Sequence, residues 1–293
     1  AEEKVGYTRY EVIEMSEMKA KALTEGPILN NGVKMPWLGL GVYKVREGSE
    51  VINAVKDAIA AGYRSIDTAA FYRNEKGVGQ AVRESGIPRE ELFITTKVWN
   101  NDQGYEETLR AFEQSRKNLG LEYIDLYLVH WAVPDKYRET WKAFIHLYQE
   151  GAVKAIGVSN HQIPHLRQII DDTGVVPAVN QVECHPLLSQ KELLAFCGLH
   201  GIRLQAWSPL IRGKLDDKVL LELAAKYGKT PAQIVLRWDI QNQIVVIPKS
   251  VHKERIIENS QIFDFQLSAE DMQRIDGLNK NKRLGPDPDR VNF

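Results

Sequence analysis

The chain has 293 residues, of which 43% are hydrophobic and 26% are charged, and its formal net charge is -1. This length and composition suffice for one large core, and the near-neutral charge gives no reason to expect a nucleic acid or a membrane as partner. No apolar run is long enough to cross a bilayer, and two cysteines, Cys184 and Cys197, do not make a disulfide framework. We therefore expect a monomer in the reducing cytoplasm.

The N-terminal residues 1–27 are polar and acidic, and we interpret them as an extension preceding one domain over residues 28–293. The domain opens with ILNNGVKM, starting at Ile28. Asn-Gly accommodates the positive φ angles of a tight turn, so this segment predicts a β-hairpin. We expect the hairpin to close the bottom of a barrel.

From there, short apolar runs alternate with longer amphipathic ones. The predicted strands are WLGLGVY, RSIDT, LFITTKVW, IDLYLVH, VKAIGVS, AVNQVE, IRLQAW and IVVIPK. The predicted helices are Ser49 to Ala61, one around Gly77 and Gly79, Tyr105 to Asn118, Lys136 to Glu150, His165 to Asp171, Gln190 to Leu199, Val219 to Tyr227 and Pro231 to Gln241. Eight strands, each followed by helical sequence, predict an α/β fold of the (β/α)8 TIM barrel type. No strand is followed by GxGxxG, so a Rossmann phosphate loop is not supported.

Four polar residues stand at or just beyond predicted strand ends: Asp67, Tyr72, Lys97 and His130. Strand ends of such a barrel open on one face, where its chemistry occurs. Lys97 would stabilise the phenolate of Tyr72, and Asp67 would hold Lys97 in place. Neutral His130 would donate a hydrogen bond to a substrate oxygen, so the set suits protonation of an oxyanion as a hydride arrives.

Each of these residues also has a structural interpretation. Asp67 would serve as a helix cap or turn residue, and Tyr72 as a half-buried core aromatic. Lys97 would be an exposed strand end, and His130 a barrel histidine with its hydrogen bonds satisfied. Their shared placement favours the catalytic interpretation.

Two further groups of residues are considered on their own. His161 and His165 are one helical turn apart, but Pro164 lies between them and no third ligand is evident, so we predict no metal site. Lys249 and Arg255 follow the last strand, where two cations around a ribose phosphate would favour NADPH over NADH. The alternative for the second group is the solvated start of a helix.

Several ordered motifs resemble the aldo-keto reductase family. The stretch GYRSIDTAAFYRNEKGVGQAV resembles the signature of the family, and YIDLYLVHW, AIGVSN, NQVECHP, AWSPL and IPKSVHKERIIEN resemble further blocks in the same order. NDQGYE, DKYRETW, IFDF and the GPDPD ending are similar to prostaglandin F synthases and 2,5-diketo-D-gluconate reductases. The resemblance runs from about Ile28 to the C-terminus.

The resemblance implies an NADP-dependent reductase of aldehydes and ketones, with Asp67, Tyr72, Lys97 and His130 as its catalytic tetrad and Tyr72 as the general acid. NADPH would lie across the strand ends. The positions that match cofactor contacts are Ser159, Asn160, Gln181, Trp207, Ser208, Leu210, Lys249, Ser250, Val251, Arg255, Glu258 and Asn259. Among them, Trp207 would stack on the nicotinamide, and Lys249, Ser250 and Arg255 would surround the 2′-phosphate.

Four aromatic residues next to the tetrad are candidates for a substrate pocket: Tyr43, Phe71, Trp99 and Trp131. Their bulk favours apolar or aromatic carbonyl compounds, although apolar aromatics are more often core residues. The ending NKNKRLGPDPDRVNF should be a loop, and its shortness implies an open pocket with broad specificity, extending to prostaglandin H2 or diketo-gluconate type substrates.

Two other functions are weighed against the reductase. A non-catalytic binding role on the same fold would be favoured by a missing tetrad residue, and none is missing. A metal-dependent barrel enzyme would need a ligand cluster, which the sequence does not offer.

Overall fold

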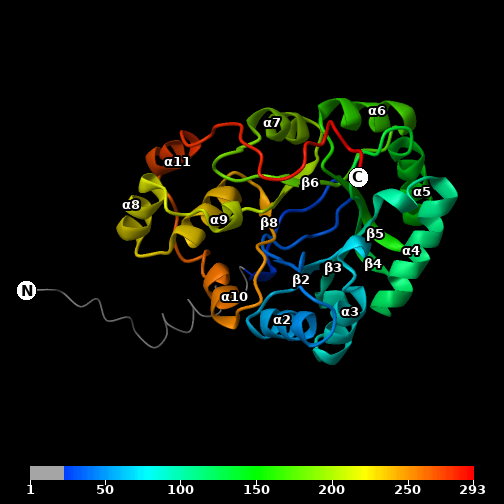
Figure 1. Ribbon diagram of the computed structural model, residues 1–293, viewed down its shortest axis with the longest axis horizontal. Coiled ribbons are helices and arrows are strands. Elements are labelled where there is room, and N and C mark those ends of the chain that lie inside the picture. The colour runs from blue at the N-terminus through cyan, green and yellow to red at the C-terminus, as the bar shows by residue number, and fades with distance from the viewer. Residues whose placement is uncertain (1–22) are drawn as a thin grey trace, which may run out of the picture.

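Eight parallel strands in sequential order form a single sheet in the computed structural model, which describes residues 23–293 (Figure 1). The first and last strands also meet. Parallel bridges join Leu38 to Val246 and Gly41 to Lys249, and the Gly39 amide donates to the Val246 carbonyl at 2.9 Å. The sheet therefore closes on itself, and the predicted (β/α)8 barrel is confirmed.

Each strand falls within one of the eight runs predicted from the sequence. The strands are β1 (Leu40–Gly41), β2 (Ser65–Asp67), β3 (Phe93–Val98), β4 (Ile124–Val129), β5 (Val153–Ser159), β6 (Val179–Glu183), β7 (Arg203–Trp207) and β8 (Val245–Val246). Because helices cover their outer face and side chains fill the interior, most strand positions are buried on both faces, as parallel strands require.

The helices surround the strands (Figure 1). They are α2 (Ser49–Ala60), α3 (Glu75–Glu84), α4 (Tyr105–Leu119), α5 (Tyr137–Gln149), α6 (Ile163–Thr173), α7 (Lys191–Leu199), α8 (Lys218–Tyr227), α9 (Pro231–Gln241), α10 (Lys253–Ser260) and α11 (Ala269–Asp276). The prediction for α9 has the observed bounds, because Thr230 and Gln233 form a capping box around Pro231.

Two helix predictions need correction. We predicted a start at His165 for α6, but the helix begins at Ile163, because Pro164 falls in the first turn, where a missing amide hydrogen costs nothing. Helix α11 was not predicted. Its signal is the side chain of Ser268, which accepts a hydrogen bond from the Asp271 amide and caps the helix.

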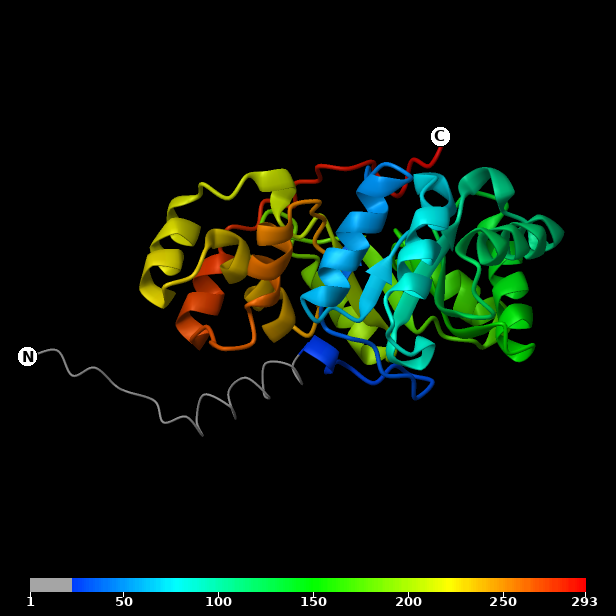
Figure 2. The same ribbon diagram turned by 90° about the horizontal axis from the view of Figure 1, so that it is seen from below.

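The predicted hairpin closes the barrel at the amino ends of the strands. Ile28 and Lys34 form an antiparallel bridge, and Leu29 donates its amide to the Val33 carbonyl at 2.8 Å. Leu29 and Met35 pack against apolar side chains inside the barrel. Figure 2 shows the hairpin in dark blue on one side of the barrel and the C-terminal segment in red on the other.

The predicted extension, residues 1–27, lies mostly outside the described residues. The part that is described joins the hairpin: the carbonyl of Glu25 accepts from Trp37 and that of Pro27 accepts from Met35, each at 3.0 Å. Glu25 also forms an ion pair with Lys34 at 2.9 Å.

The main core lies between the sheet and the helices. In one layer of it, Tyr127 of β4 stacks on Phe144 of α5 at a ring-centroid distance of 4.5 Å. Both cysteines are free and buried, as small apolar residues would be. Within residues 23–293, no helix is long and apolar enough to span a membrane. The packed interior leaves the carboxyl ends of the strands as the place where polar side chains gather.

Candidate active site

The four predicted catalytic residues come together at the carboxyl ends of β2, β3 and β4. The ammonium nitrogen Nζ of Lys97 lies 2.6 Å from Oδ1 of Asp67 and 3.2 Å from the phenol oxygen of Tyr72. The ring of His130 packs edge-on against Tyr72, with 5.8 Å between ring centroids. The four groups therefore form one contiguous cluster.

Local structure after β2 sets the position of the phenol. Tyr72 ends a 3₁₀ turn, Ala70–Tyr72, and the left-handed Arg73, with a φ of 57°, reverses the chain after it. Asn74 then donates hydrogen bonds to the carbonyls of Val42 and Val45 at 2.9 and 3.0 Å. These contacts fix the turn beside the first strand, so Tyr72 reaches Lys97 without extending into solvent.

The charges in this cluster are paired inside the protein. Lys97 is 0% exposed, and although burial lowers its pKa, the charges of Asp67 and Tyr72 outweigh burial and raise it. Burial raises the pKa of Tyr72, while the Lys97 ammonium opposes this rise. The phenol is therefore protonated at neutral pH and lies beside a positive charge that would stabilise its phenolate.

His130 is neutral. Burial, and after it the charge of Lys97, lowers the pKa of His130 well below its ordinary value. Its Nδ1 atom is buried and has no hydrogen-bond partner within residues 23–293.

Two of the structural interpretations are therefore wrong. Lys97 is not an exposed strand end, because its side chain is fully buried in an ion pair. His130 is not a barrel histidine with both nitrogens satisfied. The catalytic interpretation of the cluster stays a prediction, and the geometry supports it.

Several predicted nicotinamide contacts adjoin the tetrad at the ends of β5, β6 and β7. Gln181 donates to Oδ2 of Asp67 at 2.7 Å and to Oε1 of Gln205 at 2.9 Å. Both amide hydrogens of Gln181 are used in this way, which leaves its Oε1 to accept from a primary amide. Gln181 thus contacts the tetrad as well as being a predicted nicotinamide contact, and the sequence did not predict this double role.

Asn160 connects the tetrad to the predicted stacking aromatic. Its Nδ2 donates to the His130 carbonyl at 3.0 Å, and its Oδ1 accepts from the indole nitrogen of Trp207 at 2.8 Å. Ser159 donates its hydroxyl to the Gln181 carbonyl at 2.7 Å. The indole ring is thus held at its polar edge, close to the residues that would bind a carboxamide.

The predicted 2′-phosphate and adenine contacts follow β8, and the predicted pyrophosphate contacts, Ser208 and Leu210, follow β7. Lys249 and Arg255 are exposed, as both the phosphate and the solvated-helix interpretations require. Neither has a carboxylate within 4.0 Å in the part of the chain that the structure describes. Ser250 and Asn259 are buried, whereas Val251, Glu258, Ser208 and Leu210 are half-buried.

The four predicted pocket aromatics surround the tetrad. Tyr43 lies 5.0 Å from the Tyr72 ring, and Phe71 stacks on Trp99 at 3.8 Å. Tyr43 and Phe71 are 48% and 41% exposed, so part of this rim is open. Trp131 is only 6% exposed, so the open pocket expected from the short ending is not seen on that side.

A fifth aromatic, Phe293, was not predicted. Its ring meets Trp131 edge-on at 5.1 Å and lies 6.4 Å from Trp99, and its carbonyl accepts from Asn100 at 3.1 Å. The loop prediction for the ending is confirmed, and the loop crosses the strand ends (Figure 1). Its contacts with Trp131 and Trp99 bring the Phe293 ring to the site.

A model of the Aldo/keto reductase family matches residues 38–280. The chain belongs to this family. The match includes all four tetrad residues and the basic residues after β8.

Named relatives and a solved structure extend this finding. The chain is 58% identical over 266 residues to a glyoxal reductase of Bacillus subtilis, covering 90% of this chain and 96% of that protein. It is 57% identical to a 9,11-endoperoxide prostaglandin H2 reductase of Trypanosoma cruzi, covering 89% and 94%. A crystal structure of a mutant of Gox0644 in complex with NADPH shares 45% identity and a TM-score of 0.88, covering 91% of this chain and 98% of that one.

No group of three or more histidine, cysteine, aspartate or glutamate side chains that would hold a metal ion occurs within residues 23–293. His161 and His165 pack as aromatic rings, 5.9 Å apart, and Nδ1 of His161 donates to the Ser159 carbonyl at 2.8 Å.

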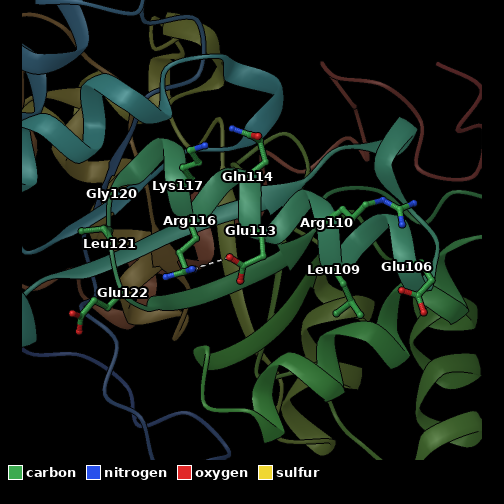
Figure 3. A pocket seen from close by; sticks show the side chains of 10 residues that line it. All are labelled: Glu106, Leu109, Arg110, Glu113, Gln114, Arg116, Lys117, Gly120, Leu121 and Glu122. Carbon is green, nitrogen blue, oxygen red and sulfur yellow. Dashed lines mark hydrogen bonds and ion pairs between the residues drawn. The ribbon is translucent and has the colours of Figure 1, made fainter.

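A hollow of about 840 Å³ lies along the outer side of α4, away from the tetrad (Figure 3). It is lined by acidic and basic side chains of α4, and its lining includes the ion pair of Arg116 with Glu113 at 2.8 Å. None of its polar groups is both buried and unpaired in the described chain. We assign it no part in the function.

Proposed function

We propose that this aldo/keto reductase reduces aldehydes and ketones to alcohols with NADPH, and that Tyr72 is the general acid. The observation that carries the proposal is the buried line from Asp67 through Lys97 to the phenol of Tyr72, at 2.6 and 3.2 Å. Burial raises the pKa of Tyr72, and the fixed Lys97 ammonium opposes this rise, so the phenol is a better proton donor than it would be in the same place without Lys97.

The residues beside the tetrad fit the cofactor. Gln181 Oε1 and the remaining lone pair of Asn160 Oδ1 would accept hydrogen bonds from a carboxamide, and Trp207 offers its ring for stacking. When bound there, NADPH supplies a hydride from its nicotinamide C4. The bound NADPH of the structural relative supports this choice of cofactor.

The preference for NADPH over NADH would come from the far end of the site. Lys249 and Arg255 are exposed cations, and neither has a carboxylate within 4.0 Å among the described residues. A 2′-phosphate between them would form charge-assisted hydrogen bonds that NADH cannot form. Ser250 and Val251, together with Glu258 and Asn259, would complete the adenosine end, and Ser208 and Leu210 the pyrophosphate.

The tetrad would act on the carbonyl oxygen. Neutral His130 would orient this oxygen through a hydrogen bond, and Tyr72 would give it a proton as the carbon gains the hydride. Lys97 would stabilise the phenolate left behind, and solvent would return the proton. Asp67 keeps Lys97 charged throughout.

Substrates would enter across the aromatic rim. Small dicarbonyls such as glyoxal and methylglyoxal fit, since the Bacillus subtilis relative is named for glyoxal. The exposed rings of Tyr43 and Phe71 also favour aromatic aldehydes, and the prostaglandin H2 reductase relative extends the range to prostaglandin H2.

The test is the decrease in NADPH absorbance with a panel of carbonyl compounds. We expect consumption with glyoxal, methylglyoxal and nitrobenzaldehyde, and the panel should also contain prostaglandin H2 and 2,5-diketo-gluconate. Binding of NADPH without consumption by any member would favour the non-catalytic role instead.

A further inference from the structure

Glu183 at the end of β6 is a buried carboxylate that the proposed reaction does not use. It is 1% exposed. Its Oε1 accepts from the Leu284 amide at 2.5 Å and lies 2.9 Å from Nε2 of His185, while its Oε2 accepts from the Gly285 amide at 3.1 Å. Both carboxylate oxygens are thus committed to a segment about one hundred residues later in the chain.

This segment, residues 279–293, is here called the C-terminal strap. The strap is also held at its start, where the Lys280 and Lys282 amides donate to the Leu187 carbonyl at 3.1 and 2.9 Å. At its end, Phe293 contacts Trp131 and Asn100 at the aromatic rim. The strap runs on the side of the barrel opposite the hairpin, over the ends of the strands (Figure 2).

The strap touches Trp207 where Glu183 holds it. A Cβ atom placed on Gly285 would lie 2.4 Å from the Cη2 atom of Trp207 and 3.3 Å from Oε2 of Glu183. Only a residue without a side chain therefore fits between the carboxylate and the indole ring. The ring is held at two edges, by Gly285 on one and by the Asn160 amide at its indole nitrogen on the other.

We propose that Glu183 is a positioning residue that acts through the C-terminal strap, holding Gly285 against Trp207 and thereby fixing the ring on which the nicotinamide stacks. This inference rests on the proposed function, because it assumes that Trp207 meets the cofactor. The charge of Glu183 matters to it: burial alone raises the pKa of Glu183, but the hydrogen bonds from His185 and the two amides outweigh burial and lower it. Hydrogen bonds to a carboxylate are stronger than those to a neutral acceptor.

The first test is limited proteolysis, which needs neither cofactor nor turnover. Trypsin has four target residues in the strap, namely Lys280, Lys282, Arg283 and Arg290. Glu183→Ala should be cleaved there about tenfold faster or more than the parent protein, because loss of two charge-assisted hydrogen bonds releases the strap. Cleavage at the parent rate would overturn the anchoring role.

The second test is NADPH affinity, measured from the fluorescence of bound NADPH without substrate. Glu183→Ala should weaken NADPH binding about tenfold, with a smaller change in kcat, because the strap does not touch Lys97 or Tyr72. A purely structural role for Glu183 would leave the NADPH affinity of the folded variant unchanged, and that result would reject the link to Trp207.

Gly285→Ala tests the same link with Glu183 intact, and it serves also if Glu183→Ala fails to fold. Its added methyl group should push the strap away from Trp207 and weaken NADPH binding several-fold. Gly277→Ala is the matched control, since a Cβ there meets nothing closer than 3.4 Å, and it should change neither readout. Equal NADPH affinity in Gly285→Ala and Gly277→Ala would contradict the inference. If the parent protein bound no NADPH, the proposed function would fail, while the trypsin result would still decide whether Glu183 anchors the strap.

Discussion

The two ends of the proposed site differ in how much of the arrangement exists before anything binds. At the tetrad, Lys97 is completely buried and paired with Asp67 at 2.6 Å. At the far end, Lys249 and Arg255 are exposed, and neither has a carboxylate within 4.0 Å among the described residues. The difference indicates that the ion pair at the tetrad is already formed before a ligand binds, whereas the two cations at the far end are still exposed to solvent. Substitutions in the tetrad should affect stability and turnover together. Substitutions of Lys249 or Arg255 should affect only the affinity for the cofactor.

The largest effect is expected from Lys97→Met. The change leaves Asp67 buried without its counter-charge, which should lower the free energy of unfolding by about 3–5 kcal/mol. It should also reduce kcat by at least about 100-fold, because the phenolate of Tyr72 loses its stabilising charge. Denaturant unfolding and steady-state kinetics measure the two effects. Lys142→Met is the control: its exposed ion pair with Glu139 should contribute less than about 1 kcal/mol.

A smaller effect is expected from the buried histidine beside Asn160. Burial lowers the pKa of His161 to about 3, so the folded protein keeps it neutral while the unfolded chain takes up a proton below about pH 6.5. The stability that depends on neutral His161 is therefore complete above pH 6.5 and is lost as the pH falls toward 3. Between pH 7 and pH 5, the free energy of unfolding of His161→Phe should therefore fall by up to about 2 kcal/mol less than that of the parent protein. Unfolding curves at the two pH values measure this difference. An equal fall in the variant and the parent protein would contradict it.

The smallest effect is expected at the exposed end. Arg255→Ala should raise the KM for NADPH about tenfold, because one charge-assisted contact to the 2′-phosphate is lost, and it should leave the KM for NADH and the stability unchanged. Lys253→Ala, an exposed change in the same helix, is the matched control. Equal losses with both cofactors would mean that Arg255 does not contact the phosphate.

Much of the site was predictable because strand ends can be located from apolar runs. Asp67, Lys97 and His130 each stand at or near the end of such a run, and a parallel barrel places strand ends on one face. Helix α9 was equally clear from Thr230, Pro231 and Gln233.

Contacts between distant loops were not predictable in this way. Glu183 meets Leu284 and Gly285 through backbone amides, which any residue sequence would supply. Phe293 reaches Trp131 along a strap without regular periodicity. The shared role of Gln181 was likewise hidden, because its amide meets Asp67 across the barrel interior, from a strand that is not a neighbour of β2 in the sheet.

We expect Tyr72 to protonate the substrate without holding the cofactor. This role is tested most directly by measuring, for Tyr72→Phe, both the Kd for NADPH and the rate of a single turnover with methylglyoxal. Phenylalanine keeps the ring against Tyr43 and His130 and removes only the hydroxyl. We expect a Kd within about twofold of the parent value and a turnover rate at least about 100-fold lower. A variant that binds NADPH and turns over at the parent rate would contradict the role of Tyr72 as the general acid.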